Sequence, residues 1–341
     1  MNDMRSDDVQ AASSFVRSRR AFMLLTAALA MQSINSKRLA AQVNQPFRFV
    51  PPSAEKRKNA IGSLNDLSAA LRRAFEPTDH FEPIPAPQPD GWLAEHPEQG
   101  QTYDQFVKTR AKRPDARRST IYLAPFGDFD DEWSPQLSDL EAAANAFFQL
   151  KVKSLPAQSM DGKKITTRFH DGKQQYLSKD FLRLLTEMRP DDGFAILGIT
   201  MQDLYPDPGW NYVFGQASPT KAVGVYSFAR YDPLFWKEKR TDSAREALMQ
   251  RSLGVLLHET CHMFGMAHCI FFSCLMNGAN NLEESDGQPL HLCPVCLRKL
   301  HYSVGFDVVD RYQALLQEYR HLAVKDEVMW LEKRLKYLRA E

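Results

Sequence analysis

Three histidines and a glutamate stand at a spacing that could hold a metal ion beside a proton acceptor. His258, Glu259 and His262 form the pattern HExxH. If this segment is helical, the two histidines lie one above the other on the same face, where both imidazoles can bind one ion. Glu259 lies next to them and could reach a water at the metal without being a ligand. The expected chemistry is zinc-dependent hydrolysis.

The pattern continues beyond the second histidine. Gly265 and His268 follow at intervals of three residues, which completes HExxHxxGxxH. A glycine can take a positive φ, end the helix and turn the chain back beneath the metal. That turn would bring His268 to the site as a third ligand and leave the fourth tetrahedral position to water. Chance would produce these five residues in roughly one chain in 10⁴ to 10⁵, and the apolar stretch 253–257 argues against an exposed surface helix.

All five cysteines lie within the 36 residues from Cys261 to Cys296. Crowding beside a histidine cluster is typical of metal binding, whereas a disulfide scaffold spreads its cysteines over the domain. Cys261 lies inside the HExxH segment, should point away from the metal and is interpreted as a small core residue. The other four could form a closed, structural zinc site, with two disulfides as the alternative if the protein is exported. These four are Cys269, Cys274, Cys293 and Cys296.

Hydrophobic periodicity and turn residues predict the elements that must position these groups. From residue 119 onward the pattern is α/β. The predicted strands are 120–123, 152–157, 194–200, 212–215 and 223–228. The predicted helices are 138–150 and 178–188, both capped by serine, then 243–264 with the HExxH motif, and 307–322 and 325–338, which should pack on the outside. In the first of these, Glu141 should complete a capping box with Ser138.

The chain divides by composition into four predicted parts. Residues 1–45 form a leader, 46–118 an extension, 119–322 the catalytic domain and 323–341 a C-terminal helix. The extension should hold a helix at 63–75 and an extended proline-rich run at 82–89.

The leader resembles a twin-arginine export signal. Arg19 and Arg20 precede the apolar run Ala21–Met31, whose 11 residues are too few to span a bilayer but fit a signal peptide, and a cleavage region follows at 39–41. Lys37 and Arg38 count against export, so the alternative is a cytoplasmic protein with an amphipathic or disordered leader.

Composition excludes some partners. The net charge of +1 gives no field that would attract nucleic acid or an anionic membrane. The basic stretch 108–118 lacks interleaved aromatic residues and is interpreted as a solvated loop. We expect a monomer with no bound nucleic acid and no stable membrane insertion.

Together these motifs resemble the archaemetzincin family of metzincin zinc peptidases. The pattern HExxHxxGxxHC, then Cys274-Leu275-Met276, then Cys293-x-x-Cys296 is similar to the family's, with a slightly shorter spacer at 277–292. The stretches 198–201, 210–217 and 227–231 resemble the archaemetzincin-2 branch in particular. The resemblance covers roughly residues 60–320 and leaves the leader outside.

The resemblance implies a metzincin (α+β zincin) fold, with a twisted mixed sheet, an antiparallel edge strand, a long active-site helix, a Met-turn and a helical C-terminal part. Met276 would be the Met-turn residue, an apolar floor under the zinc ligands. An extended peptide would add as a further strand along the edge strand above the cleft. That strand would comprise Tyr212, Val213, Phe214, Gly215, Gln216 and Ala217.

The hypothesis is therefore a zinc metallopeptidase that binds a peptide or protein substrate. It would hold two zinc ions per chain, one catalytic and one structural, with Glu259 as general base toward a zinc-activated water. The alternative is a zinc-stabilised peptide-binding module that does not cleave. The spacing Cys293-x-x-Cys296 also occurs in thioredoxin-like oxidoreductases. There the cysteines open a helix after a strand in a βαβ pattern, which we do not expect here, so we do not interpret the chain as an oxidoreductase.

Overall fold

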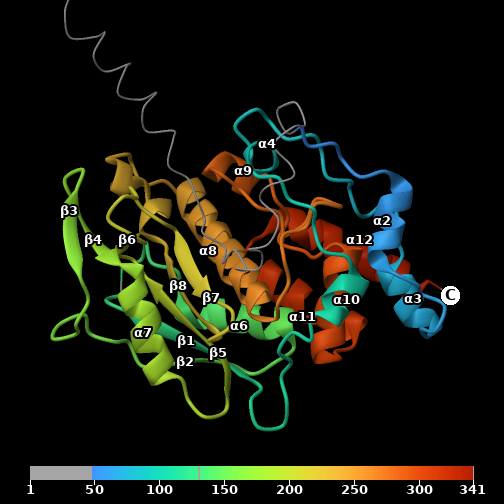
Figure 1. The fold of residues 1–341 in the computed structure, drawn as a ribbon, viewed down its shortest axis with the longest axis horizontal. Helices are drawn as coiled ribbons and strands as arrows, with labels where there is room; N and C mark the ends of the chain where they lie inside the picture. Colours follow the sequence, from blue (N-terminus) through green and yellow to red (C-terminus); the bar gives the residue numbers. More distant parts are fainter. Residues whose placement is uncertain (1–47, 130, 341) are drawn as a thin grey trace, which may run out of the picture.

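A computed structural model of the chain describes residues 48–129 and 131–340 (Figure 1). The predicted leader, with its arginine pair and cleavage region, lies outside the described residues and stays a prediction. Among the described residues, no helix combines the length and the apolar composition that a membrane crossing needs. The observed strands and helices confirm the predicted α/β class, and the domain limits stay predictions.

A five-stranded mixed sheet forms the centre of the fold, in the order β2-β1-β5-β8-β7. The first four strands run parallel, and β7 pairs antiparallel with β8 at the edge. The bounds are β1 (Thr120–Phe126), β2 (Val152–Ser154), β5 (Gly193–Thr200), β7 (Gly215–Ser218) and β8 (Val223–Ser227). The predicted strands 120–123, 194–200 and 223–228 are thus confirmed with slightly different ends.

Two predicted strands have wrong bounds: the strand 152–157 is predicted to end too late, and the strand 212–215 to begin and end too early. The strand predicted at 152–157 stops at Ser154, since Pro156 has no amide hydrogen to donate to the sheet. The strand predicted at 212–215 begins only at Gly215, because Val213 instead bridges Leu204 of a second sheet. This sheet, in the order β3-β4-β6, lies at one end of the molecule (Figure 1). Its strands are β3 (Thr167–His170), β4 (Lys173–Leu177) and β6 (Asp203–Tyr205).

Helices cover both faces of the main sheet, because its strands present apolar side chains on both sides. On β1, Ile121 and Leu123 belong to the core shared with α6 and α8. Phe126 points to the other face, where its ring meets Phe181 of α7 edge-on. The helices that match predicted ones are α6 (Leu137–Phe148), α7 (Ser178–Met188), α8 (Asp242–Met263), α11 (Val308–His321) and α12 (Lys325–Arg339).

The predicted serine caps of α6 and α7 are wrong. Helix α6 begins one residue before Ser138, and Glu141 accepts a hydrogen bond from the amide of Ser154 (2.8 Å) instead of closing a capping box. Helix α7 begins at Ser178 itself, whose hydroxyl donates to the side-chain oxygen of Gln216 (2.6 Å). Tertiary partners thus replace the local caps that sequence spacing predicts.

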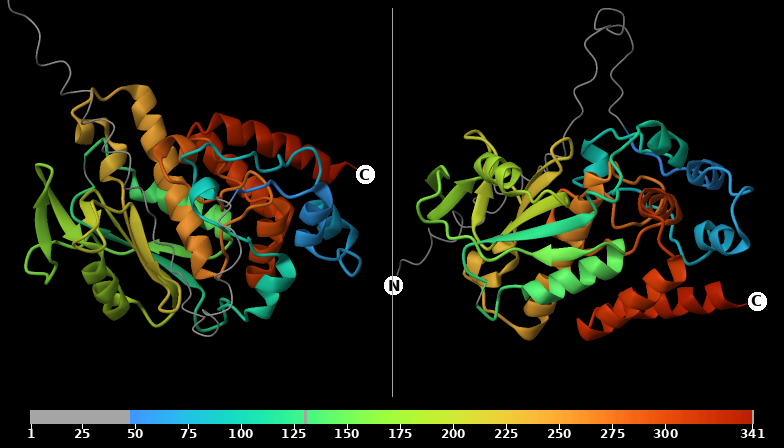
Figure 2. Two further views of the ribbon diagram at one scale, coloured as in Figure 1. Left: turned by 45° about the horizontal axis from the view of Figure 1, so that its top comes forward. Right: turned by 90° about the horizontal axis from the view of Figure 1, so that it is seen from below.

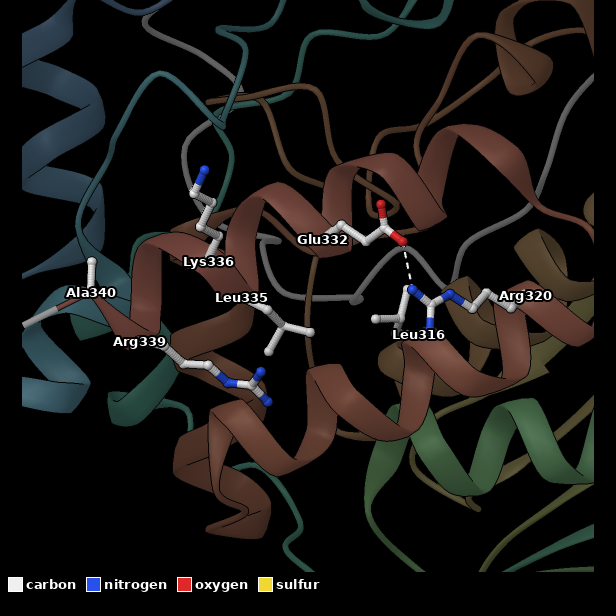
Figure 3. A pocket seen from close by; sticks show the side chains of 7 residues that line it. All are labelled: Leu316, Arg320, Glu332, Leu335, Lys336, Arg339 and Ala340. Carbon is white, nitrogen blue, oxygen red and sulfur yellow. Dashed lines mark hydrogen bonds and ion pairs between the residues drawn. The ribbon is translucent and has the colours of Figure 1, made fainter.

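The C-terminal helices α11 and α12 pack side by side as an outer layer, as predicted (Figure 2). The buried guanidinium of Arg311 on α11 donates to the carbonyl of Phe147 on α6 (2.6 Å), which joins this layer to the core. A surface pocket lies between the two helices, where Arg320 donates to Glu332 (2.6 Å) (Figure 3). Its lining residues include none of the predicted site residues.

The segment before β1 packs along the C-terminal half of the molecule. Its helices are α2 (Ala54–Ile61), α3 (Ala69–Phe75), α4 (Trp92–Glu95) and α5 (Tyr103–Lys108). The predicted helix 63–75 is wrong in its start, because the Ser68 hydroxyl accepts from the Leu71 amide and caps the helix there. Three of these helices, α2, α3 and α5, contact α10. The remaining helices are η2 (Ala229–Tyr231), η3 (Pro233–Trp236), α9 (Leu282–Asp286) and α10 (Pro294–Val304).

Candidate metal centres

Helix α8 carries the HExxH residues on a buried surface. Leu253, Leu256 and Leu257 are fully buried just upstream, so the helix is fixed in the core before it reaches the histidines. The helix ends at Met263, and Gly265 takes a left-handed φ of +84°. A side chain is excluded there, since a Cβ on Gly265 would lie 2.6 Å from the Cβ of Ala111. The predicted glycine turn after the helix is therefore present.

The turn brings all three histidines together. The Nε2 atoms of His258 and His262 lie 3.0 Å apart, and the ring of His268 lies 5.3 and 5.2 Å from theirs, centroid to centroid. One ring nitrogen from each residue falls in a group spanning at most 4.8 Å. Tetrahedral zinc with Zn–N bonds of about 2.0 Å needs nitrogens about 3.3 Å apart. The three side chains therefore fit one zinc ion.

The outer nitrogens of the rings are held by oxygen acceptors. Nδ1–H of His258 donates to the carbonyl of Leu275 (2.7 Å), and that of His262 to the carbonyl of Met266 (2.5 Å). Nδ1–H of His268 donates to a carboxylate oxygen of Glu98 (2.8 Å). These bonds leave each Nε2 as the ligand atom. Nε2 of His268 is buried and has no hydrogen-bond partner among the described residues. A buried nitrogen without a partner is expected at a metal-binding position.

Burial also sets the protonation of this centre. Desolvation and the neighbouring His268 lower the pKa of His258 to about 3, so its imidazole is neutral and able to bind a metal at pH 7. Desolvation raises the pKa of Glu259 to about 8. Glu259 lines a small cavity of about 60 Å³ together with His258, Phe214 and Tyr231. A carboxyl with a pKa near neutrality beside a metal site is suited to accept and return a proton.

Met276 lies in a turn at residues 275–276, next to the Leu275 carbonyl that contacts His258. Its side chain is fully buried, and its carbonyl accepts from the amide of Cys269 (2.7 Å). Asn277 holds the turn closed: its Oδ1 accepts from the Cys274 amide (2.8 Å), and its Nδ2 donates to the carbonyls of Cys269 (2.8 Å) and Phe272 (3.0 Å). The preceding carbonyl, that of Leu275, is the acceptor for His258. The turn thus orients the His258 ring through its backbone.

The four clustered cysteines meet beside this turn. All are buried, and their sulfurs lie within 4.8 Å of one another, with 3.6 Å between Sγ of Cys269 and Sγ of Cys293. A disulfide needs sulfurs about 2.05 Å apart, whereas tetrahedral zinc with Zn–S bonds of about 2.3 Å places them about 3.8 Å apart. The amides of Met276 and Cys293 point at Sγ of Cys274 (3.4 and 3.3 Å). The geometry fits a closed zinc site and not two disulfides.

Cys293 and Cys296 do open a helix, but not after a strand, so the expectation that the thioredoxin-like pattern is missing is confirmed. Cys293 is the N-cap of α10 and Cys296 lies in its first turn, since Pro294 occupies the first helical position, where proline is favoured. A loop and not a strand precedes the helix. Because both thiols belong to the four-cysteine group, the thioredoxin-like interpretation stays excluded.

The predicted substrate strand is shifted. Strand β7 holds Gly215, Gln216 and Ala217, whereas Tyr212 and Val213 precede it and connect it to the second sheet. Phe214 also precedes β7 and lines the cavity beside Glu259.

Two residues of the histidine centre escaped the sequence analysis. Glu98 lies 170 positions before the histidine that it contacts, and no spacing rule connects them. Asn277 directly follows Met276, the predicted Met-turn residue, and only that position could have indicated it.

Comparison with known proteins matches the same part of the chain. Residues 126–302 match the model of peptidase family M54. The chain is 38% identical over 279 residues to archaemetzincin-2 of Macaca fascicularis and 37% identical to that of Homo sapiens, covering 72% of this chain and 77% of each relative. Archaemetzincin-1 of Homo sapiens is 34% identical, over 66% of this chain and 51% of that protein.

Solved structures of archaemetzincins are also similar. The protein from Archaeoglobus fulgidus, complexed with malonate, is 27% identical over 53% of this chain and 99% of its own, with a TM-score of 0.40. The protein from Methanopyrus kandleri is 26% identical over 57% of this chain and 99% of its own, with a TM-score of 0.43.

Proposed function

The chain belongs to peptidase family M54, the archaemetzincins, and is a zinc metallopeptidase; on this premise we propose the role of each residue in catalysis. His258, His262 and His268 hold the catalytic zinc, and Glu259 is the general base in hydrolysis of a peptide bond. The observation that carries this proposal is the convergence of three buried imidazoles beside a buried carboxyl. The substrate is a peptide or protein.

His258, His262 and His268 would hold a zinc ion, which would supply a Lewis acid able to polarise the scissile carbonyl and make a water more acidic. Glu259 accepts the proton of the attacking water and delivers it to the nitrogen of the leaving amine. Desolvation raises the pKa of this carboxyl to about 8 in the metal-free centre. The positive charge of a bound zinc ion would lower that pKa again and leave Glu259 ionised, as a proton acceptor must be. His258 and His262 contribute by staying neutral, because burial lowers the pKa of both imidazoles.

A second zinc at the four cysteines has a structural role in this proposal. Cys269 directly follows the ligand His268, and Cys274 begins the turn that contains Met276. An ion at this site would fix both ends of that loop, and with it the Leu275 carbonyl that orients His258. The proposed stoichiometry is therefore two zinc ions per chain.

Substrate binding along the edge strand remains part of the proposal. Strand β7 is the edge of the five-stranded sheet among the described strands, and an extended peptide could pair with it. Phe214, just before β7, lines the cavity next to Glu259 and brings that edge close to the proposed reaction centre.

Replacing Glu259 by glutamine tests the mechanism. Glu259→Gln should retain both zinc ions, measured by elemental analysis, and lose hydrolysis by about 10²- to 10⁴-fold. Cleavage is followed by mass spectrometry on a peptide library, with and without a chelator. Glu246→Gln is the matched control, because Glu246 is an exposed glutamate on the same helix.

The outcomes are distinct. Chelator-sensitive cleavage by the wild type that is lost in Glu259→Gln supports the proposal. Full activity in zinc-loaded Glu259→Gln refutes the general-base role. A peptide that the zinc-loaded wild type binds but leaves intact would indicate a binding module.

A further inference from the structure

The segment 92–101 reaches the histidine centre from outside residues 126–302, the stretch that matches the family model. Glu98 nevertheless lies 2.8 Å from Nδ1 of His268, and the His268 side chain is only 4% exposed. Helix α8 and backbone carbonyls orient His258 and His262, whereas the outer partner of His268 is a side chain from a distant segment. The third ligand thus depends on a separate piece of the chain.

We propose that Glu98 is a positioning residue for the third zinc ligand, and that segment 92–101 is a working part of the catalytic centre. This inference rests on the proposed zinc site. A carboxylate that accepts from the outer nitrogen of a metal-binding histidine fixes the ring, selects the tautomer and raises the basicity of the ligand nitrogen. A charged acceptor does this more strongly than a carbonyl. His268 needs this support most, because it lies on a loop beyond the end of α8.

The same segment holds the chain on both sides of His268. Before it, Gln101 donates to the carbonyl of Gly265 (3.3 Å) and accepts from the amide of Ala267 (3.2 Å). After it, Ile270 packs so closely on Gly100 that a Cβ there would lie 2.6 Å from Cγ1 of Ile270. The Gly100 backbone has a left-handed φ of +68°, which suits glycine. These contacts fix the loop that carries the third ligand.

The segment is itself anchored to the rest of the fold. The amide of Trp92 donates to both carboxylate oxygens of Glu284 (2.9 and 3.0 Å). The Trp92 ring is buried, meets His268 edge-on at 5.2 Å and lies so close to Gly278 that a Cβ there would be 2.5 Å from the ring. Asn280 donates to the side chain of Glu95 (3.2 Å). Glu98 is therefore presented from an ordered support.

The test compares zinc affinity in three full-length variants. Glu98→Ala removes the acceptor, Glu98→Gln keeps a weaker neutral one, and Glu55→Gln is the control, because Glu55 is an exposed glutamate on α2. Zinc at the histidines is titrated against a competing chelator, and the visible spectrum of the Co²⁺-substituted protein reports the ligand geometry. The melting temperature of each variant before and after metal removal reports folding.

We expect Glu98→Ala to weaken zinc binding at the histidines by about 10- to 100-fold, with a smaller loss in Glu98→Gln and none in Glu55→Gln. The Co²⁺ spectrum should change in Glu98→Ala, and the zinc at the cysteines should remain. Wild-type affinity and spectrum in folded Glu98→Ala and Glu98→Gln would overturn the inference while leaving the proposed function intact. A wild type that binds no zinc at its histidines would overturn both.

Discussion

Replacing Glu259 by glutamine should also change how the stability of the protein depends on pH when the histidine centre is free of metal. Glu259 is fully buried, and desolvation raises its pKa from 4.5 to about 8. The folded protein therefore keeps this proton between pH 4.5 and about 8, whereas the unfolded chain releases it. The folded state binds the extra proton, so stability falls as the pH rises through this window. A glutamine cannot ionise and removes that slope.

The magnitude follows from the size of the pKa change. At 1.36 kcal/mol per pH unit, a rise from 4.5 to about 8 costs the folded wild type about 5 kcal/mol above pH 8. At pH 7 the penalty is about 3 kcal/mol, and at pH 5 it is below about 1 kcal/mol. Between pH 5 and 7 the free energy of unfolding of Glu259→Gln should therefore rise by about 2 to 3 kcal/mol relative to that of the wild type. The buried histidines oppose this trend, since their lowered pKa values cost stability as the pH falls, but both proteins share that effect.

Urea denaturation at pH 5, 6, 7 and 8 measures the difference. The histidine centre is stripped with a mild chelator, and elemental analysis verifies that the cysteine site keeps its zinc. Burying the glutamine amide has a cost that does not depend on pH, so it lowers the stability of the variant equally at every pH. The test is therefore how the difference in free energy of unfolding between the two proteins changes with pH. Parallel curves for the two proteins would refute the claim that Glu259 is desolvated without a charged partner.

Two further substitutions test the supports of the site. Cys274→Ser should leave one zinc per chain by elemental analysis and lower stability by several kcal/mol, because a closed zinc site contributes directly to folding. Cys261→Ala is the control: it removes the cysteine outside the cluster and should keep two zinc ions per chain. Gly265→Ala should destabilise by more than the roughly 1 to 2 kcal/mol that a left-handed φ costs an L-residue, since its Cβ also meets Ala111. Gly305→Ala has the same left-handed φ with nothing within 4 Å and isolates the conformational cost. Equal losses in the two glycine variants would contradict the close contact at Gly265.

The parts of the site that could be predicted from sequence are those with local geometry. Two histidines four apart on a helix must share a face, so His258 and His262 follow from spacing alone. His268 follows from a glycine that ends the helix, and the structure shows that turn with a left-handed φ at Gly265. The central strand β5 is predictable because its apolar run is buried along its whole length.

The parts that could not be predicted depend on contacts between distant residues. Glu98 is one glutamate among many until the fold places it against His268. Glu141 has the spacing of a capping box, yet the amide of Ser154 is the partner that it finds in the folded chain. The start of β7 is decided by the bridge of Val213 to the second sheet, whose short and partly exposed strands lack a clear pattern. The helix that begins at Cys293 is different, because Pro294 at its first position is a signal that the sequence does contain.

The most direct test of the account is an anomalous difference map, recorded at the zinc edge from a crystal of the full-length protein. We expect two peaks per chain: one at bonding distance from the Nε2 atoms of His258, His262 and His268, and one among the four cysteine sulfurs. A crystal structure in which the His268 ring points away from the metal, or a map with no peak among the three histidines, would contradict the proposed zinc centre.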